Sequence, residues 1–161
     1  MATEFTLYLE KQVLNEELVL EGVHNLGFTS TTETPSDGPR FECESCCDTL
    51  GFVVTLRKSS NPPNNVFDVD LLGREFVFRQ SLNFWFDREI ELSPSFEKAL
   101  KMIFDVMSKV RMRAFLYTSS FEELCFFNED KSLYLNKSSG MWKVVDVRKE
   151  LSAWKVIEVT L

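Results

Sequence analysis

Hydrophobic residues recur every three or four positions along residues 93–110, which is the spacing of one face of an α-helix. Glu97 lies on the polar face one turn before Lys101, the favourable order for an ion pair. Ser93 can cap the first turn, and Pro94 suits the first helical position because its missing N–H has no partner there. We predict that this main helix covers the apolar face of a sheet. Its expected buried residues are Phe96, Ala99, Leu100, Ile103, Phe104, Met107 and Val110.

Segments that alternate apolar and polar residues lie on both sides of this helix and predict strands. The strongest alternation covers residues 82–92, where apolar side chains face one way and Trp85 lies among acidic residues on the other face. Gly73 and the sequence NEDK at 128–131 predict turns between strands. The other expected strands are residues 3–9, 41–44, 50–58, 66–72, 75–79, 112–117, 123–127 and 132–136, and residues 146–153 and 155–159 predict a short helix followed by a strand.

A second helix is expected near the N-terminus. Asn15 is a suitable N-cap, and acidic residues follow it in the first turn, where the helix dipole favours them. Leu14 and Val19 have the spacing of a hydrophobic staple. Gly27 is a typical C-terminal stop, whereas Gly22 inside the helix weakens it by up to ~1 kcal/mol.

These elements predict the fold class. Their connections resemble hairpins and do not alternate regularly between strand and helix. We therefore expect an α+β fold, a mainly antiparallel β-sheet with two or three helices packed on it. Residues 1–161 should form a single domain, because neither side of the SSNPPNN loop at 59–65 could build a core alone. The hydrophobic fraction of 44% is typical of a folded protein, and fifteen Phe residues indicate an aromatic core.

The negative charge is concentrated in the N-terminal third. Residues 1–50 contain ten acidic and two basic side chains, a net charge of −8, whereas residues 51–161 have a net charge of +1. An acidic surface repels phosphate backbones and anionic lipid, so we expect neither nucleic acid nor membrane as a partner. It attracts a basic protein. A surface that is acidic only for solubility is the alternative at this point.

The N-terminal sequence MATEFTLYLE has no basic segment followed by an apolar run, so a signal peptide is not expected. Ala at position 2 excludes N-myristoylation. No segment is long and apolar enough to span a bilayer. These features predict a cytoplasmic protein, whose four Cys residues are then reduced.

Catalytic and metal-binding patterns are weak. Cys43, Cys46 and Cys47 form C-x-x-C-C, but a zinc site needs a second ligand pair, and Cys125 is distant in sequence. His24 is the only imidazole, and no phosphate-binding, dinucleotide-binding or nucleophile-elbow motif is present. We therefore expect structural thiols, no metal, no cofactor and no catalytic residues.

The best candidates for function are partner-binding residues. Trp85 shares the polar side of its segment with acidic neighbours, and an exposed aromatic of this kind is typical of a protein interface. The alternative is that a second helix covers this face and makes Trp85 part of the core. The candidate contact residues are Glu42, Glu44, Asp48, Trp85, Asp87, Glu89 and Glu91.

The order of the elements carries a family resemblance. The initial strand and L-N-E-E-L helix are followed by the aromatic run FVFRQSLNFWFDRE, the long helix FEKALKMIFDVMSK, the segment AFLYTSSFEELCFFNEDKSLYLN, a turn and Trp142. This pattern resembles small bacterial immunity proteins of polymorphic-toxin systems, most closely those that protect against myxobacterial swarming-inhibition (Sit-type) toxins. The Cys cluster and the SSNPPNN loop depart from the pattern.

The resemblance implies a cytosolic protein that binds one cognate toxin and blocks it. It carries over no contact residues, so the candidates above rest on charge and on Trp85 alone. The sequence therefore predicts a toxin-neutralising immunity protein whose toxin has a basic surface. A non-catalytic adaptor domain and a small enzyme remain the alternatives.

Overall fold

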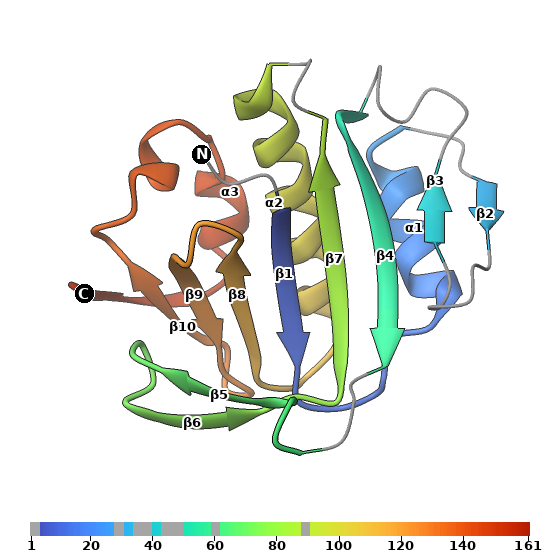
Figure 1. Ribbon diagram of the computed structural model, residues 1–161. Helices are drawn as coiled ribbons and strands as arrows, with labels where there is room; N and C mark the ends of the chain where they lie inside the picture. Colours follow the sequence, from blue (N-terminus) through green and yellow to red (C-terminus); the bar gives the residue numbers. More distant parts are fainter. Residues whose placement is uncertain (1–3, 28–30, 34–39, 43–49, 59–61, 88–90) are drawn as a thin grey trace.

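The computed structural model describes residues 4–27, 31–33, 40–42, 50–58, 62–87 and 91–161, with backbone only for 31–33 and 40–42. Figure 1 shows their arrangement. In chain order the elements are β1 (Glu4–Leu9), α1 (Glu16–Asn25), β2 (Thr31–Glu33), β3 (Arg40–Glu42), β4 (Phe52–Lys58), β5 (Val66–Val69), β6 (Arg74–Val77), β7 (Gln80–Phe86), α2 (Leu92–Lys109), β8 (Ala114–Thr118), β9 (Glu123–Phe127), β10 (Ser132–Asn136), the 3₁₀ helix η2 (Gly140–Lys143), α3 (Arg148–Leu151) and β11 (Lys155–Val159).

The described strands form one large sheet in the order β11-β10-β9-β8-β1-β7-β4-β3-β2, and β5 and β6 form a separate hairpin. Neighbouring strands of the large sheet are antiparallel except β10 and β11, which are parallel. The N-terminal strand β1 lies between β7 and β8, so two strands that come much later in the chain pair with it. The predicted α+β class with a mainly antiparallel sheet is confirmed.

Helices α1 and α2 lie on one face of the sheet, behind the strands in Figure 1. Phe5, Leu7 and Leu9 of β1 are completely buried in the core between them and the sheet. On α2 the expected apolar face is buried apart from Val110, which is partly exposed, and Met102 and Val106 are buried as well. This wider buried face has a physical reason, since α2 contacts α1 in addition to the sheet.

The start of α2 differs from the prediction. The helix begins at Leu92, two residues before the expected first helical residue Pro94, and its N-cap is Glu91, whose side chain makes no capping hydrogen bond. Ser93 is therefore not the cap, and Pro94 is the third helical residue. Proline is tolerated there because none of the first four N–H groups of a helix has an intrahelical partner. The strand expected over residues 82–92 is shorter, because β7 ends at Phe86 and Leu92 is already helical.

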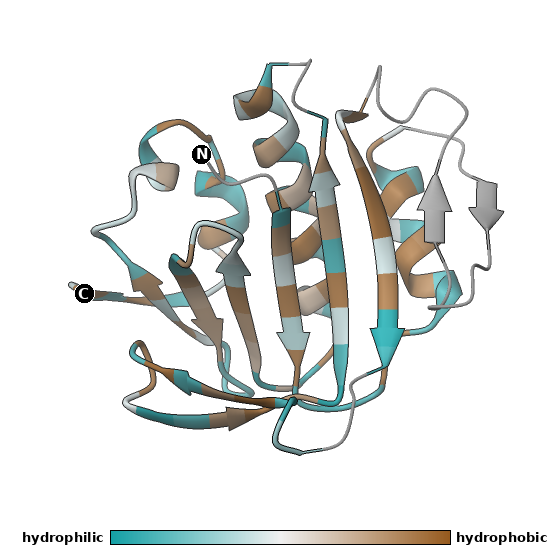
Figure 2. Cartoon of the chain, in the orientation of Figure 1, coloured by the Kyte–Doolittle hydropathy of each residue, from teal (hydrophilic) through white to brown (hydrophobic). Residues whose placement is uncertain are grey.

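The predicted ends of α1 are confirmed. The side chain of Asn15 accepts a hydrogen bond of 3.0 Å from the N–H of Leu18, and Gly27 follows the helix with a φ of +89°. Leu14 and Val19 are both buried, as a staple requires. Along β1 and β7, apolar and polar residues alternate as the sequence pattern indicates (Figure 2).

The β5–β6 hairpin covers part of the other face of the sheet. Its residues Phe67 and Phe76 pack with Phe78, which follows β6, onto aromatic side chains that point away from the helices. Those side chains are Tyr8 of β1, Phe115 of β8, Phe126 of β9 and Tyr134 of β10. The carboxylate of Glu123 holds the hairpin by accepting from the N–H groups of Asp70 and Leu71, at 2.8 and 2.9 Å. The sequence predicts both strands and the turn at Gly73, but not this second layer.

Candidate functional site

The strand register places the side chains of the sheet face opposite the helices in rows. Trp85 of β7 pairs with Glu4 of β1 on one side and with Val53 of β4 on the other. In the next row Asn83 pairs with Thr6 and Thr55. The rows beyond lead to Tyr8 and Phe115, which the β5–β6 hairpin covers. The hairpin thus packs on the rows of Tyr8 and Phe115. In the other two rows Trp85 is half-exposed, whereas Asn83, Thr6 and Thr55 are buried.

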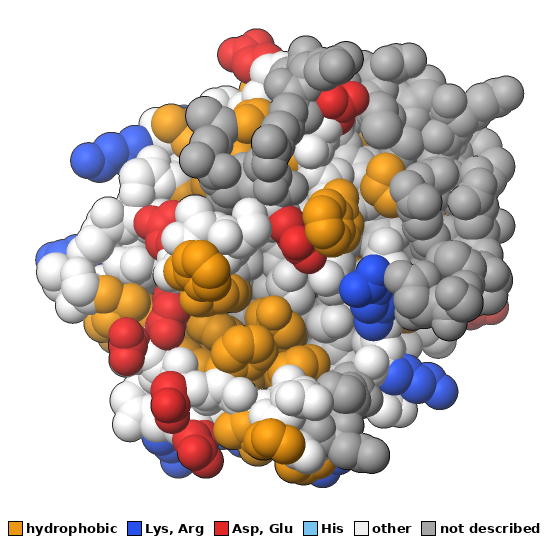
Figure 3. Space-filling view, in the orientation of Figure 1, with side chains coloured by type: hydrophobic (Ala, Val, Ile, Leu, Met, Phe, Trp, Pro, Cys, Tyr) orange, Lys and Arg blue, Asp and Glu red, His pale blue; other side chains and the backbone are white. Residues whose placement is uncertain are grey.

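Trp85 is the large hydrophobic residue that stands out on this face. Its side chain is 49% exposed, whereas Phe84 and Phe86 on either side of it are buried in the core. The alternative that an additional element buries Trp85 is therefore wrong. In the space-filling view of this face, hydrophobic side chains gather above the hairpin with acidic side chains around them (Figure 3).

Glu4 is fixed beside Trp85 by three neighbours. Its Oε1 atom accepts from Nδ2 of Asn83 at 2.9 Å and from the hydroxyl of Thr6 at 3.4 Å. Its backbone exchanges hydrogen bonds with Ser119, the residue that follows β8. An acidic oxygen is thereby held in a defined position next to an exposed indole.

Asn83 contributes an unused acceptor. Only 8% of the residue is exposed, and its Oδ1 atom has no hydrogen-bond partner among the described residues. The amide cannot be reversed to solve this, because Nδ2 must face the Glu4 carboxylate, which only accepts. Leaving a buried acceptor unsatisfied costs about 1–3 kcal/mol, and this atom is closed to solvent.

A second exposed aromatic lies on the β8 side of Glu4. Phe121 is 84% exposed, and it occupies the turn that joins β8 to β9, where its N–H bonds to the carbonyl of Thr118. Its φ of +62° is unusual for a bulky residue and costs about 1–3 kcal/mol. We use the name Trp85 surface for Glu4, Asn83, Trp85 and Phe121. Sequence reasoning missed Glu4, Asn83 and Phe121, although an apolar residue within the polar turn TSSFEE is a signal that could have been noticed.

The predicted contact residues are only partly brought together. Asp87 follows β7, and its N–H bonds to the carbonyl of Gly51 at 2.9 Å. Glu91 is exposed at the start of α2. The backbone of Glu42 lies in β3, one residue beyond Phe41, which pairs with Val54, so it continues the row of Val53 and Trp85. The predictions for Glu44, Asp48 and Glu89 lie outside the described residues.

Two tyrosines at the edge of the hairpin are held in the neutral form. Burial raises the pKa of Tyr8 above its usual value, and the charge of Glu4 adds to the shift. Burial also raises the pKa of Tyr117, helped by Glu123. Because both pKa values move upwards, neither phenol ionises near neutral pH. The negative charge next to Trp85 therefore comes from carboxylates.

The sequence offers the single histidine and the cysteines as possible metal ligands. His24 is exposed on α1, and within these residues no cluster of three or more His, Cys, Asp or Glu side chains could hold a metal ion. Cys125 is completely buried in β9, and burial raises the pKa of its thiol far above the usual value. Cys43, Cys46 and Cys47 lie outside the described residues.

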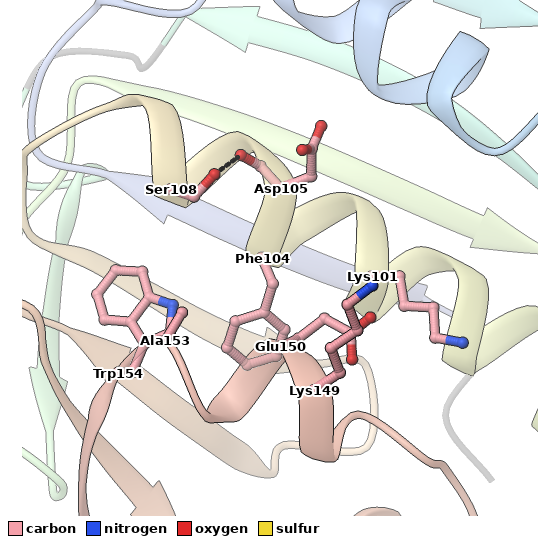
Figure 4. A pocket seen from close by; sticks show the side chains of 8 residues that line it. All are labelled: Lys101, Phe104, Asp105, Ser108, Lys149, Glu150, Ala153 and Trp154. Atoms are coloured by element: carbon pink, nitrogen blue, oxygen red, sulfur yellow. Dashed lines mark hydrogen bonds between the residues drawn. The ribbon is translucent and has the colours of Figure 1, made fainter.

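A surface groove of about 240 Å³ lies between α2 and α3. Phe104 of α2 and Trp154, just before β11, point into it, whereas Asp105 points away (Figure 4). The amine of Lys131 lies 4.8 Å from the centre of the Trp154 ring, and the Phe127 ring packs against the same indole. The groove therefore lies where the C-terminal segment packs against the main core.

The part of the chain that the structure describes contains no helix long and apolar enough to cross a membrane. Its distinguishing features are an α+β sheet with helices on one face and, on the other, the half-exposed Trp85 next to the fixed carboxylate of Glu4. This arrangement defines a small α+β protein with an exposed tryptophan on the sheet face that the helices leave uncovered.

The SitI3-like family model matches residues 3–145, which is most of the chain. The protein therefore belongs to the SitI3-like family, in agreement with the resemblance to Sit-type immunity proteins. No curated protein and no solved structure matches the chain. The family match ends before α3 and β11, so the segment that supplies the parallel edge strand lies beyond it.

Proposed function

We propose that this protein is an immunity protein that binds one cognate toxin in the cytoplasm and blocks it without catalysing a reaction. The observation that carries the proposal is the match to the SitI3-like family over residues 3–145. An immunity family implies a toxin as partner.

The Trp85 surface is the contact region that we propose. Tryptophan is enriched among the residues that dominate binding energies, and Trp85 is 49% exposed on a sheet face that the helices leave uncovered. Phe121 adds a second exposed ring in a strained turn, and Glu4 lies between the two. Strained backbone is concentrated at functional sites, which supports a role for this turn in binding.

The charge distribution supports a basic partner. The net charge of −8 over residues 1–50 includes Glu4 and Glu42, and both lie in the row of Trp85. A toxin that acts on nucleic acid has a basic site, and an acidic inhibitor can occupy it as a substrate mimic. Glu44, Asp48, Asp87, Glu89 and Glu91 remain candidate contacts on the same charge argument.

The test is protection of cells that express the toxin encoded next to the gene for this chain. Co-expression of the wild-type protein should restore growth, and the two purified proteins should form a complex. A Trp85→Ala variant should weaken that complex by roughly 2 kcal/mol or more, the usual threshold for a dominant contact. The matched control is Trp142→Phe, a change to a partly buried tryptophan outside the Trp85 surface.

A wild-type protein that neither protects cells nor binds the toxin would contradict the proposal. The adaptor interpretation would then take its place, because an exposed aromatic next to a carboxylate would suit another protein partner equally well. If the Trp85→Ala variant binds as tightly and protects as fully as wild type, the proposed function stands but the Trp85 surface is not the contact region.

A further inference from the structure

Three side chains of the Trp85 surface converge on one point of the sheet. Trp85 and Asn83 are two residues apart on β7, so they point to the same face, and Glu4 lies directly opposite Trp85 on β1. Side chains opposite each other on neighbouring strands lie about 4.5–5.5 Å apart at Cβ, and diagonal neighbours remain within reach of long side chains. An indole face and a carboxylate are thus presented together, and the buried amide of Asn83 donates to that carboxylate.

The indole and the carboxylate share one chemical preference. The carboxylate of Glu4 accepts hydrogen bonds and cannot donate one. Both hydrogen bonds that it accepts from described residues go to Oε1, and one of them comes from Asn83, whose own Oδ1 atom is closed to solvent. The indole of Trp85 has a negative face that attracts cations. A ligand for this point needs several N–H donors and a positive charge.

We infer that Glu4 and Trp85, with Asn83 holding Glu4 in position, form the binding site for an arginine side chain of the cognate toxin. A guanidinium is planar and carries five donors in a fixed fork, so it can stack on the indole while its N–H groups reach the Glu4 carboxylate. A lysine offers one compact ammonium and cannot stack flat on the indole while presenting a fork of donors to the carboxylate. The inference rests on the proposed function, because that function supplies the basic protein partner.

The burial of Asn83 and its neighbours indicates that the position of Glu4 is fixed by the fold. Asn83 and its neighbours Thr6, Thr55 and Ser81 are each at most 8% exposed, although they lie on the face without helices. The position of Glu4 is fixed by Asn83, Thr6 and Ser119. The Glu4 carboxylate is therefore oriented before the partner arrives, which reduces the ordering cost of binding.

The experiment measures the affinity of the toxin encoded by the neighbouring gene for a set of variants. Glu4→Gln keeps the side-chain shape and the acceptor for Asn83 but removes the charge, and it should weaken binding at least tenfold. Asn83→Ala should have an effect of similar size, and Trp85→Ala should weaken binding about 30-fold. Trp85→Phe keeps an apolar ring with a weaker negative face, so its loss should be smaller.

Glu158→Gln is the matched control, since it removes one negative charge from an exposed position on β11, at the far edge of the sheet. It should leave the affinity within twofold of wild type. Each toxin arginine is then changed to Ala and to Lys. For one of these arginines, both the Ala and the Lys variant should lose as much affinity as Glu4→Gln causes. Combining that toxin variant with Glu4→Gln should cost much less binding free energy than the sum of the two separate losses.

The outcomes are distinguishable. If the wild-type protein protects and binds but Glu4→Gln and Asn83→Ala match Glu158→Gln, the arginine site is overturned and the proposed function stands. If the wild-type protein does not bind, the proposed function fails and the inference fails with it. Should Asn83→Ala unfold, Glu4→Gln and Trp85→Phe still decide. If the free protein self-associates and Glu4→Gln abolishes that self-association, the site binds a second copy of this chain, and the inference of a toxin arginine is overturned.

Discussion

Gly22 of α1 lies directly against Met102 of α2. A Cβ atom added at Gly22 would be 3.2 Å from Cγ and 3.3 Å from Cε of Met102, closer than ordinary van der Waals contact. Gly22 is buried, and Met102 is 1% exposed. A position that sequence reasoning treats only as a weakness of the helix is therefore the point at which the two helices approach each other.

This contact makes the effect of Gly22→Ala dependent on Met102. Alanine favours the helix by up to ~1 kcal/mol over glycine. Overpacking a filled interface costs about 1–3 kcal/mol, and Cγ of Met102 is too near its own backbone to move freely. We expect a net loss of about 1 kcal/mol in the free energy of unfolding, measured by urea denaturation.

The control for this prediction is the same change in a Met102→Ala background, where the obstruction is gone. There Gly22→Ala should stabilise the protein relative to Met102→Ala alone. Equal effects of Gly22→Ala in the two backgrounds would show that the Met102 contact does not decide the outcome.

The buried face of α2 predicts a second result. Ile103 is completely buried, and Phe104 packs its ring against Phe127 with a centroid distance of 5.5 Å. Changing either residue to Ala should lower the free energy of unfolding by ~2–5 kcal/mol, through lost transfer energy and a cavity. Ser108→Ala on the exposed side of the helix should change it by less than about 0.5 kcal/mol. Unchanged melting temperatures for both core variants would contradict the packing described above.

Local patterns account for the elements that the sequence predicts correctly. Residues Glu123–Phe127, Ser132–Asn136 and Lys155–Val159 are strands with the expected bounds, and Asn15 and Gly27 mark the ends of α1. Each of these signals lies within a few neighbouring residues. Periodicity, capping and turn chemistry are sufficient to detect them.

Long-range pairing explains what the sequence does not show. Glu4 and Trp85 are neighbours only because β1 inserts between β7 and β8, and no local pattern specifies that order. The exposed state of Trp85 depends on the β5–β6 hairpin stopping short of it, which is again a tertiary arrangement. The acidic residues near Trp85 in the sequence therefore do not include Glu4, which pairs with it across the sheet.

The Glu10–Arg113 pair predicts a pH dependence of stability. The carboxylate of Glu10 accepts from Nε and an Nη atom of Arg113 at 3.2 and 2.8 Å, at the end of β1. This hydrogen bonding holds the pKa of Glu10 below its ordinary value of 4.5. A lowered pKa means that the stabilisation is complete above pH 4.5 and is lost as the pH falls through the folded value.

Glu10→Gln should therefore lower the free energy of unfolding by about 1 kcal/mol at pH 7, discounted for partial exposure, and by progressively less below pH 4.5. Denaturant titrations between pH 3 and 7 measure this. Glu129→Gln, whose carboxylate lies 3.7 Å from Lys11 at an exposed site, is the control and should cost less than about 0.5 kcal/mol throughout. A constant difference between Glu10→Gln and wild type across the range would refute the linkage.

Cys125 predicts a thiol-labelling result. It is free and completely buried, and burial keeps its pKa high, so it is neither accessible nor ionised in the native protein. In a variant with Cys43, Cys46 and Cys47 changed to Ser, no thiol should react with a water-soluble disulfide reagent until denaturant is added, and one should react afterwards. Labelling of this variant in its native state would place Cys125 at the surface.

The same cysteines predict the metal content of the wild-type protein. Because a second ligand pair is missing from the C-x-x-C-C sequence, protein purified without chelator should contain less than one zinc per chain by elemental analysis. One tightly held zinc that is lost on Cys43→Ser would reverse the interpretation of these thiols as structural.

Charge and the indole of Trp85 should act on different steps of toxin binding. The acidic N-terminal third attracts a basic partner before contact, so it should set the association rate and weaken with salt. Changing Glu42 and Glu44 to Lys should slow association, most strongly at low ionic strength. Trp85→Ala should instead speed dissociation, because a side chain that fills a pocket acts after the complex has formed. Surface-based kinetics at several salt concentrations separate the two rates.

The control is a double change of Glu150 and Glu158 to Lys, which alters the net charge by the same amount in the C-terminal segment. An equal slowing by both double variants would mean that net charge, and not the acidic N-terminal third, steers the encounter.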